Sequence, residues 1–319
     1  MSQYRNIMVI ADPQQPGSPA LRRAGALAKA SGATLHLRLF CHHPGITAVG
    51  LFNREVAELA RKELLQEQHH WLEREADSLR TRVPQVRVDV LWGEPVHDAI
   101  VTEVQNLKPD LVLKDVESVP ALKRLLFTPL DWHLLRLCPA PLLMVNRGGH
   151  VLPKRVIAAV DTAVDTPDSA EMNNAIVRAA LELALQCDAQ VKLAHVFEGL
   201  PPVPRSAIGD LGMTGAGIDE ELRGLRTNNF RAFADRQGVP EERRHLLDGP
   251  ADMALASLAH DTAADVVVLG SVTRTGLERI LMGSTAERLL GGLSCDVLVI
   301  KPERFAVDLA RHHPLAKAA

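Results

Sequence analysis

The chain repeats itself, and this repeat limits the folds it can adopt more than any other feature. Asp110 in the first half recurs as Asp265, 155 residues later, and the apolar segment 7–12 recurs as 156–161 at an offset of 149. Six extra residues separate the two offsets, and we expect them in the loop 201–217, where an insertion costs little. The 319 residues therefore predict two copies of one domain.

Each half alternates short apolar runs with amphipathic stretches, which predicts a parallel sheet of five strands with helices on both faces. The predicted strands are 7–11, 34–40, 86–91, 111–114 and 142–145, then 155–160, 190–197, 243–247, 266–269 and 297–300. The predicted helices are 19–30, 54–82, 95–106 and 129–137, then 169–186, 219–237, 251–260 and 284–290. We expect domains over 1–147 and 153–304, joined by a Gly/Pro-containing linker within 146–154 and followed by a flexible tail over 305–319.

Composition excludes several classes of partner. The formal net charge of −3 and the absence of a basic stripe argue against direct binding of nucleic acid. No apolar run approaches the length that crosses a bilayer, and nothing at the N-terminus resembles a signal peptide. The four cysteines form no C-x-x-C pair. We therefore expect a cytoplasmic protein that does not bind membranes.

One stretch in the second half has the pattern of an anion site. The buried strand 266–269 runs into a loop of glycine, serine and threonine over 270–276, and a second such group, 283–285, precedes a short helical pattern. Backbone N–H groups in such a loop, together with the positive end of a helix dipole, hold anions. The stretch contains neither the P-loop nor the G-x-G-x-x-G dinucleotide motif.

The spacing of this stretch resembles the nucleotide loop of the universal stress protein family, which runs Gly, two residues, Gly, nine residues, then Gly followed by Ser or Thr. Gly270, Gly283 and Ser284 match that pattern, and Thr273 replaces the second glycine. The run 127–135 resembles the tandem, two-domain branch of the family, and the likeness in layout covers nearly the whole chain.

The resemblance implies two tandem universal stress domains, paired within the chain as a pseudo-dimer that hides their sheet edges. It also implies an adenine nucleotide such as ATP, in the second domain only, and allows Mg²⁺ with it and a homodimer of the tandem chain. Asp161 would meet the adenine or ribose end, and Val196 would offer main-chain groups to the base. The residues implied to hold the phosphates are Gly270, Gly283, Ser284 and Thr285, with Arg274 as charge partner and Thr273 within the loop.

A second interpretation of the loop stays open. Thr273 has a Cβ and resists a positive φ, so a loop shaped for glycine would be reshaped there. Gly270 and Gly283 would then serve a tight turn and close packing, with Ser284 as a helix N-cap.

The first half departs from the motif. An offset of 155 places Asp115 opposite Gly270 and Thr128 and Pro129 opposite Gly283 and Ser284. Asp115 brings negative charge to the position of the phosphates, which opposes their binding. Thr128 and Pro129 fit a helix start as N-cap and first residue. We therefore expect no ATP binding in the first half.

Neither catalysis nor a metal site is expected. Cys41, His42, His43, His97 and His133 lie near predicted strand ends, yet no pair has a metal-ligand spacing. The sequence contains no G-x-S-x-G and no H-E-x-x-H motif. At most, slow ATP hydrolysis is expected.

The resulting hypothesis is a cytoplasmic stress-response protein that binds an adenine nucleotide in its second domain and acts through unidentified protein partners. Two alternatives remain. One is an interaction scaffold that needs no nucleotide. The other is a carrier of a non-nucleotide metabolite, suggested by the apolar, Pro/Gly-rich loop 199–217.

Overall fold

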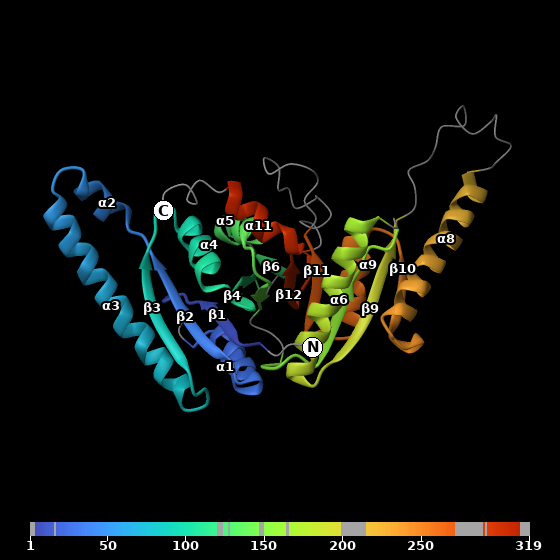
Figure 1. Cartoon of the computed structure of the whole chain (residues 1–319), viewed down its shortest axis with the longest axis horizontal. Helices are drawn as coiled ribbons and strands as arrows, with labels where there is room; N and C mark the ends of the chain where they lie inside the picture. The colour runs from blue at the N-terminus through green and yellow to red at the C-terminus, as the bar shows by residue number, and fades with distance from the viewer. Residues whose placement is uncertain are drawn as a thin grey trace. The chain divides into compact units, whose positions relative to one another are not determined.

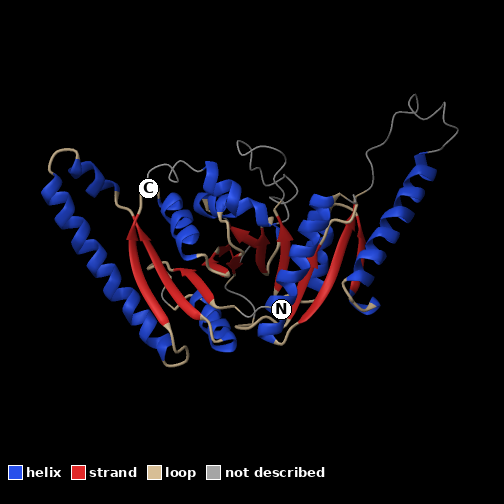
Figure 2. Cartoon of the chain, viewed as in Figure 1, coloured by secondary structure: helices blue, strands red, loops and turns tan. Residues whose placement is uncertain are grey.

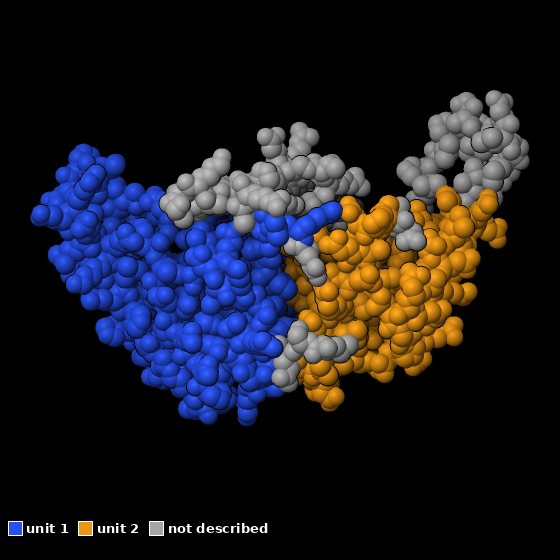
Figure 3. All heavy atoms as spheres, in the orientation of Figure 1, with its two compact units in different colours: residues 1–152, 273–281, 303–319 blue, residues 153–272, 282–302 orange. Residues whose placement is uncertain are grey.

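The computed structural model describes residues 4–15, 17–119, 124–126, 128–146, 150–163, 166–198, 215–271, 290 and 292–312. It divides into two compact units (Figure 3). Unit 1 contains the described residues of Met1–Leu152 and the C-terminal helix, and unit 2 contains those of Pro153–Val272 and the last strand.

Unit 1 is built on five parallel strands (Figures 1 and 2). In spatial order they are β7 (Leu142–Val145), β4 (Leu111–Asp115), β1 (Asn6–Ile10), β2 (Thr34–Cys41) and β3 (Val86–Trp92). Its helices are α1 (Pro19–Ser31), α2 (Pro44–Gly50), α3 (Arg54–Arg80), α4 (Val96–Leu107) and α5 (Pro129–Leu137). The inner strands are buried on both faces, as expected for a parallel sheet covered by helices.

Unit 2 repeats this order with β12 (Asp296–Ile300), β11 (Val266–Gly270), β8 (Arg155–Ala159), β9 (Gln190–Phe197) and β10 (Arg244–Asp248). Its described helices are α6 (Pro167–Cys187), α8 (Gly215–Arg236) and α9 (Ala251–Asp261), with a short 3₁₀ helix, η3 (Glu241–Arg243). Each of the ten expected strands is present, with ends that differ from the prediction by at most one residue. The predicted helix 284–290 lies outside the described residues except for its last position.

The sequence missed three small elements of unit 1. Helix α2 and the antiparallel pair β5 (Glu117–Val119) and β6 (Arg124–Leu126) were not expected. All are shorter than eight residues, so they show too few turns or alternations for periodicity to reveal them.

The repeated aspartate has one structural role in both units. Oδ2 of Asp110 accepts hydrogen bonds from the main-chain N of Arg5 and Asn6 at 2.7 and 2.8 Å. Oδ2 of Asp265 does the same for Lys154 and Arg155 at 2.7 and 2.9 Å. The carboxylate therefore fixes where the first strand of each unit begins.

The position of the inserted residues corrects the sequence-based expectation. Ile7 pairs with Leu35, whereas Val156 pairs with Val191, so the interval between the first two strands is seven residues longer in unit 2. The interval from the second strand to the third is the same in both units. The insertion therefore lies between β8 and β9 and not in the loop 201–217.

Helix α6 contains that insertion. It has 21 residues against 13 in α1. Both helices end at a left-handed cap, Gly32 in α1 and Asp188 in α6, and these caps occupy equivalent places before the second strand. Counted back from the caps, α6 has about two additional turns at its N-terminus. A helix absorbs whole turns without disturbing the strands it joins.

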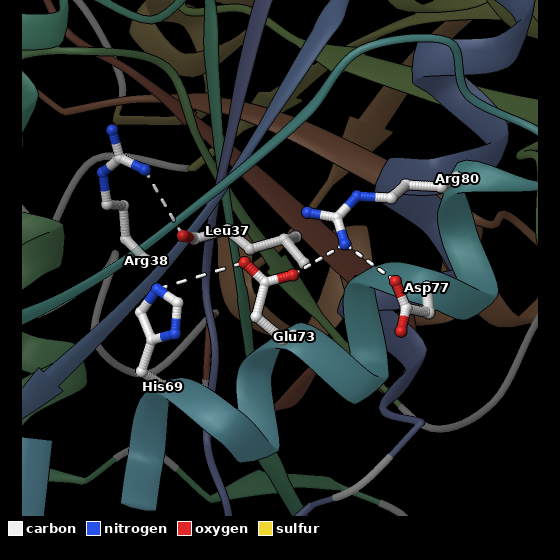
Figure 4. A network of polar contacts seen from close by, with 6 residues as sticks. All are labelled: Leu37, Arg38, His69, Glu73, Asp77 and Arg80. Carbon is white, nitrogen blue, oxygen red and sulfur yellow. Dashed lines mark hydrogen bonds and ion pairs between the residues drawn. The ribbon is translucent and has the colours of Figure 1, made fainter. Parts of the chain in front are cut away.

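The charged face of α3 is solvated, as the sequence predicts. Nη1 of Arg80 bonds to Oε2 of Glu73 at 2.6 Å and to Oδ1 of Asp77 at 2.8 Å, and His69 lies 4.0 Å from Glu73 (Figure 4). These pairs follow helical spacing, and they contribute little at an exposed surface.

The flexible tail expected from residue 305 is corrected by the structure. Helix α11 (Glu303–His312) buries Phe305 and Leu309 against Val101 of α4 and Leu137 of α5. The two buried residues are one turn apart, so they form an apolar stripe too short to stand out in the sequence. Residues 313–319 lie outside the described part.

Candidate functional site

The carboxyl ends of β9, β8 and β11 bring three of the predicted site residues to one edge of unit 2. Asp161 follows β8, Val196 is the second-last residue of β9, and Gly270 ends β11. The strands are neighbours in this order, and the chain order reverses between β8 and β11. Such a reversal is where open α/β sheets bind ligands.

The other predicted site residues cannot be placed at this edge by the structure. Thr273, Arg274, Gly283, Ser284 and Thr285 all lie outside the described residues. The same holds for residues 199–214, which contain most of the loop that suggested a metabolite carrier.

Asp161 is exposed and its main chain is held firmly. The side chain of Asn173 in α6 accepts from Asp161 N at 2.9 Å and donates to Asp161 O at 2.7 Å, and Ser169 Oγ donates to the same carbonyl at 3.1 Å. The carboxylate accepts from Ala163 N through Oδ1 at 3.0 Å. Within the described chain, Oδ2 has no hydrogen bond. One carboxylate oxygen therefore faces solvent at the strand reversal.

Gly270 has a packing reason for lacking a side chain. A Cβ at this position would lie 2.6 Å from Sδ of Met172 and 3.0 Å from Cδ1 of Ile176, both on α6. Its φ is not positive, so no left-handed backbone requires glycine here. This supports the packing interpretation for Gly270 and leaves the rest of the loop untested.

A buried cation lies where β11 and β12 end. Nζ of Lys301 donates to Oγ of Ser271 at 2.9 Å, and Ser271 N donates to Ile300 O at 2.9 Å. Lys301 is 8% exposed. It follows β12 directly, at the base of the predicted phosphate loop, and could meet an anion there. Lys301 is not among the predicted site residues, although a lysine directly after an apolar strand is a signal that the sequence contains.

His195 is a second residue that the sequence missed. It lies on the inward face of β9, is 2% exposed, and its ring stacks near Phe230 of α8 with centroids 6.0 Å apart. Burial lowers the pKa of His195, so the ring is neutral at pH 7. Val196, next to it, is half-buried and in register with Leu247 of β10.

The equivalent edge of unit 1 is occupied by the unit's own carboxylates. Asp115 ends β4, as Gly270 ends β11, and its Oδ1 accepts from Ala20 N at the start of α1 at 2.9 Å. Burial raises the pKa of Asp115. Asp131 is fully buried, forms an ion pair with Lys114 at 2.7 Å and completes a capping box with Thr128.

These contacts confirm Thr128 as the N-cap of α5 and Pro129 as its first residue. They also show how unit 1 differs from an anion site. Both helix N-termini at this edge already have a carboxylate partner, from Asp115 and Asp131.

The histidines near the edge of unit 1 form pairs. The rings of His97 and His133 stack at a centroid distance of 4.1 Å, and Nε2 of His42 lies 3.2 Å from Oε1 of Glu94. Among the described residues, no group of three His, Cys, Asp or Glu side chains is arranged to hold a metal ion. The same part of the chain has no helix with the length and hydropathy of a membrane span.

Comparison with known proteins gives a consistent result. The model of the universal stress protein family matches residues 3–146 and again residues 153–301. Universal stress protein E of Escherichia coli is 30% identical over 307 residues, which cover 96% of each chain. Its homolog in Haemophilus influenzae is 28% identical over 94% of this chain and 98% of its own.

Solved structures agree over the full length. A putative universal stress protein from Pseudomonas aeruginosa has a TM-score of 0.72 at 27% identity and covers 97% of both chains. A functionally unknown protein from the same species has the same TM-score at 26% identity, covering 99% of this chain and 98% of that one. The chain therefore belongs to the universal stress protein family and contains two of its domains in tandem.

Proposed function

We propose that unit 2 binds an adenine nucleotide at the carboxyl edge of β9, β8 and β11, and that the protein acts as a cytoplasmic stress-response regulator. Occupancy of the site would alter the loop 270–285 and hence a surface that protein partners contact. Family membership supports the stress-response role.

The free carboxylate oxygen of Asp161 is the observation that carries this proposal. It lies at the strand reversal, and main-chain contacts from Asn173 and Ser169 fix its position. A carboxylate of this kind accepts hydrogen bonds from ribose hydroxyls or from a base amino group. Lys301 supplies a cation toward the side where phosphates would lie.

The family also includes a member crystallised with a nucleotide. A universal stress protein in complex with cAMP is 21% identical to this chain, covers 46% of it and has a TM-score of 0.33. Its likeness is confined to a half of the chain, so the proposal rests on the site residues and not on that complex.

The test begins with the purified full-length protein. Mass spectrometry of ligand released on denaturation identifies any bound nucleotide, and calorimetric titration with ATP, with and without Mg²⁺, measures affinity and stoichiometry. We expect one site per chain. Intrinsic fluorescence is a poor probe because Trp71, Trp92 and Trp132 all lie in unit 1.

Matched variants locate the site. Asp161→Ala should weaken ATP binding by about tenfold or more, since it removes a hydrogen bond to a charged group. Asp12→Ala, at the equivalent position of unit 1, is the control and should leave binding unchanged. Gly283→Val should abolish binding, and Thr273→Gly should strengthen it. Equal affinity of all variants, or no binding at roughly millimolar ATP, would refute the proposal.

A nucleotide-independent scaffold is the second candidate, and an exposed apolar cluster on unit 1 favours it. Leu51 and Phe52 are 80% and 91% exposed at the turn between α2 and α3, beside Val49, Val56 and Leu59. Clusters of this kind commonly mark interaction surfaces. Phe52→Asp should then abolish the stress phenotype while ATP variants leave it intact, and the reverse pattern would reject the scaffold.

A further inference from the structure

His195 is a buried polar residue on an apolar face of β9. The inward face of β9 is otherwise apolar, with Val191, Leu193 and Phe197 at the alternate positions. A histidine buried to 98% on such a face costs free energy unless its ring nitrogens have hydrogen-bond partners. Its contacts therefore show what the ring does there.

One ring nitrogen contacts the end of β8. Nδ1 of His195 lies 3.1 Å from Val160 O and 3.4 Å from Thr162 N. The carbonyl contact is the shorter, so we assign the proton to Nδ1, which then donates to Val160. Across the described chain, Nε2 of His195 and Oγ1 of Thr162 are buried without a hydrogen-bond partner. Buried polar atoms therefore lie next to both Val160 and Thr162, the two neighbours of Asp161 in the sequence.

The main chain at residues 160–162 is consequently held from two sides. His195 holds it from β9, and Asn173 holds Asp161 N and O from α6. Helix α6 makes three hydrogen bonds to Asp161, two from Asn173 and one from Ser169, and Val160 N donates to Ala194 O of β9 at 2.9 Å. The contact of His195 adds a side-chain partner at Val160 O, which fixes the orientation of the peptide that precedes Asp161 and with it the direction of the Asp161 side chain.

Unit 1 provides an internal comparison. The strand registers place Leu39 where unit 2 has His195, and Pro13 where it has Thr162. The imidazole is therefore absent at this position of unit 1. Asp12, the equivalent of Asp161, instead bonds through its carboxylate to Gln14 N at 2.9 Å and to the Gln15 amide at 3.4 Å. Its two carboxylate oxygens are both engaged within unit 1.

We propose that His195 is a positioning residue that fixes the main chain of residues 160–162 and so sets the direction in which Asp161 presents its free carboxylate oxygen to the adenosine part of a ligand. This rests on the proposed function for the identity of the ligand. The positioning itself is a property of the unliganded protein.

The binding test replaces His195 with leucine, the residue that unit 1 has at the equivalent position, Leu39. His195→Leu should weaken ATP binding by about tenfold, the value of one net hydrogen bond, whereas His195→Asn keeps a donor near the Nδ1 position and should stay within about threefold of the parent. His245→Leu is the control, because His245 lies on β10 of the same unit and has no contact with β8. His195→Leu binding as tightly as the parent would overturn the proposal.

A second readout separates this proposal from the proposed function. In the full-length protein labelled with ¹⁵N-histidine, the ring of His195 should carry its proton on Nδ1 near neutral pH. Amide exchange at Asp161 should be faster in His195→Leu and restored in His195→Asn. If ATP does not bind the parent but these two results hold, the nucleotide assignment fails and the positioning role stands. Unchanged amide exchange at Asp161 in His195→Leu would overturn the positioning role even where ATP binds.

Discussion

The two units place different residues at the same strand end, and the helix beside it explains why. In unit 1 a short α1 begins next to β4, and Asp115 caps its N-terminus. In unit 2 the longer α6 continues for about two more turns past that position, so Met172 and Ile176 fill the space and residue 270 has no side chain. The additional turns supply Met172, and Ile176 stands where α1 has Ala20, so both the insertion and this replacement favour glycine at position 270.

The same insertion supplies the contacts of the candidate site. Ser169 and Asn173, which hold Asp161, lie in the additional turns of α6 and have no counterpart in α1. The candidate site therefore depends on α6 as well as on the glycine loop.

Exchanging the residues at the equivalent ends of β11 and β4, Gly270 and Asp115, should have the largest effect on stability. Gly270→Asp should destabilise the protein by about 4 kcal/mol, because it overpacks against α6 and buries a carboxylate that has no helix N-terminus to cap. Chemical denaturation followed by circular dichroism measures this loss. The exposed Gly292→Asp is the control. The reciprocal Asp115→Gly should cost only about 1 to 2 kcal/mol, the value of a lost cap. Equal costs for the two exchanges would contradict the comparison.

Removing the ion pair of unit 1 should have the next largest effect. Asp131→Ala should cost about 3 kcal/mol, because Lys114 is left buried without its carboxylate and α5 loses its capping box. Unit 2 has Leu269 at the position of Lys114. The double variant Lys114→Leu/Asp131→Ala should therefore recover part of the loss, measured as an interaction energy in a double-mutant cycle. A double variant as unstable as the sum of both single variants would show that the pair is not coupled.

Acidification should lower the free energy of unfolding by a smaller amount, through His36 of unit 1. Burial, followed by the charges of Arg38 and Arg87, lowers the pKa of His36 in unit 1 to about 4, while unit 2 has Lys192 at this position. The folded-state pKa lies below the unfolded value of 6.5. The contribution of neutral His36 to the free energy of unfolding is therefore complete above pH 6.5 and is lost as the pH falls toward 4.

Between pH 7.5 and 5 the loss should be about 2 kcal/mol. His36→Gln, which keeps a donor for Oδ1 of Asn6, should be less sensitive to pH by that amount. Urea denaturation at the two pH values measures the difference. A variant with the parent's pH dependence would show that His36 does not titrate in this way.

The strands could be predicted because most of them are buried and leave continuous apolar runs. The capping of α5 by Thr128 could also be predicted, because an N-cap depends on local sequence. The place of the insertion was not visible. A helix lengthened by whole turns keeps its amphipathic period, so the sequence offers no signal to separate it from a loop insertion.

The candidate site could be predicted only in part. Asp161 follows an apolar strand and was recognisable, whereas Asn173, His195 and Lys301 act through contacts between residues far apart in the sequence. Such tertiary contacts leave no periodic pattern. For Gly270 the structure shows packing against side chains of α6, and its role in holding phosphates stays a prediction.

The packing of α11 on unit 1 has a consequence for how the protein forms during translation. The helix that covers Val101 and Leu137 is encoded after all of unit 2, so unit 1 leaves the ribosome with an apolar surface that stays uncovered until residues 303–312 have been synthesised. A nascent unit 1 therefore spends the synthesis time of more than 150 residues without part of its core.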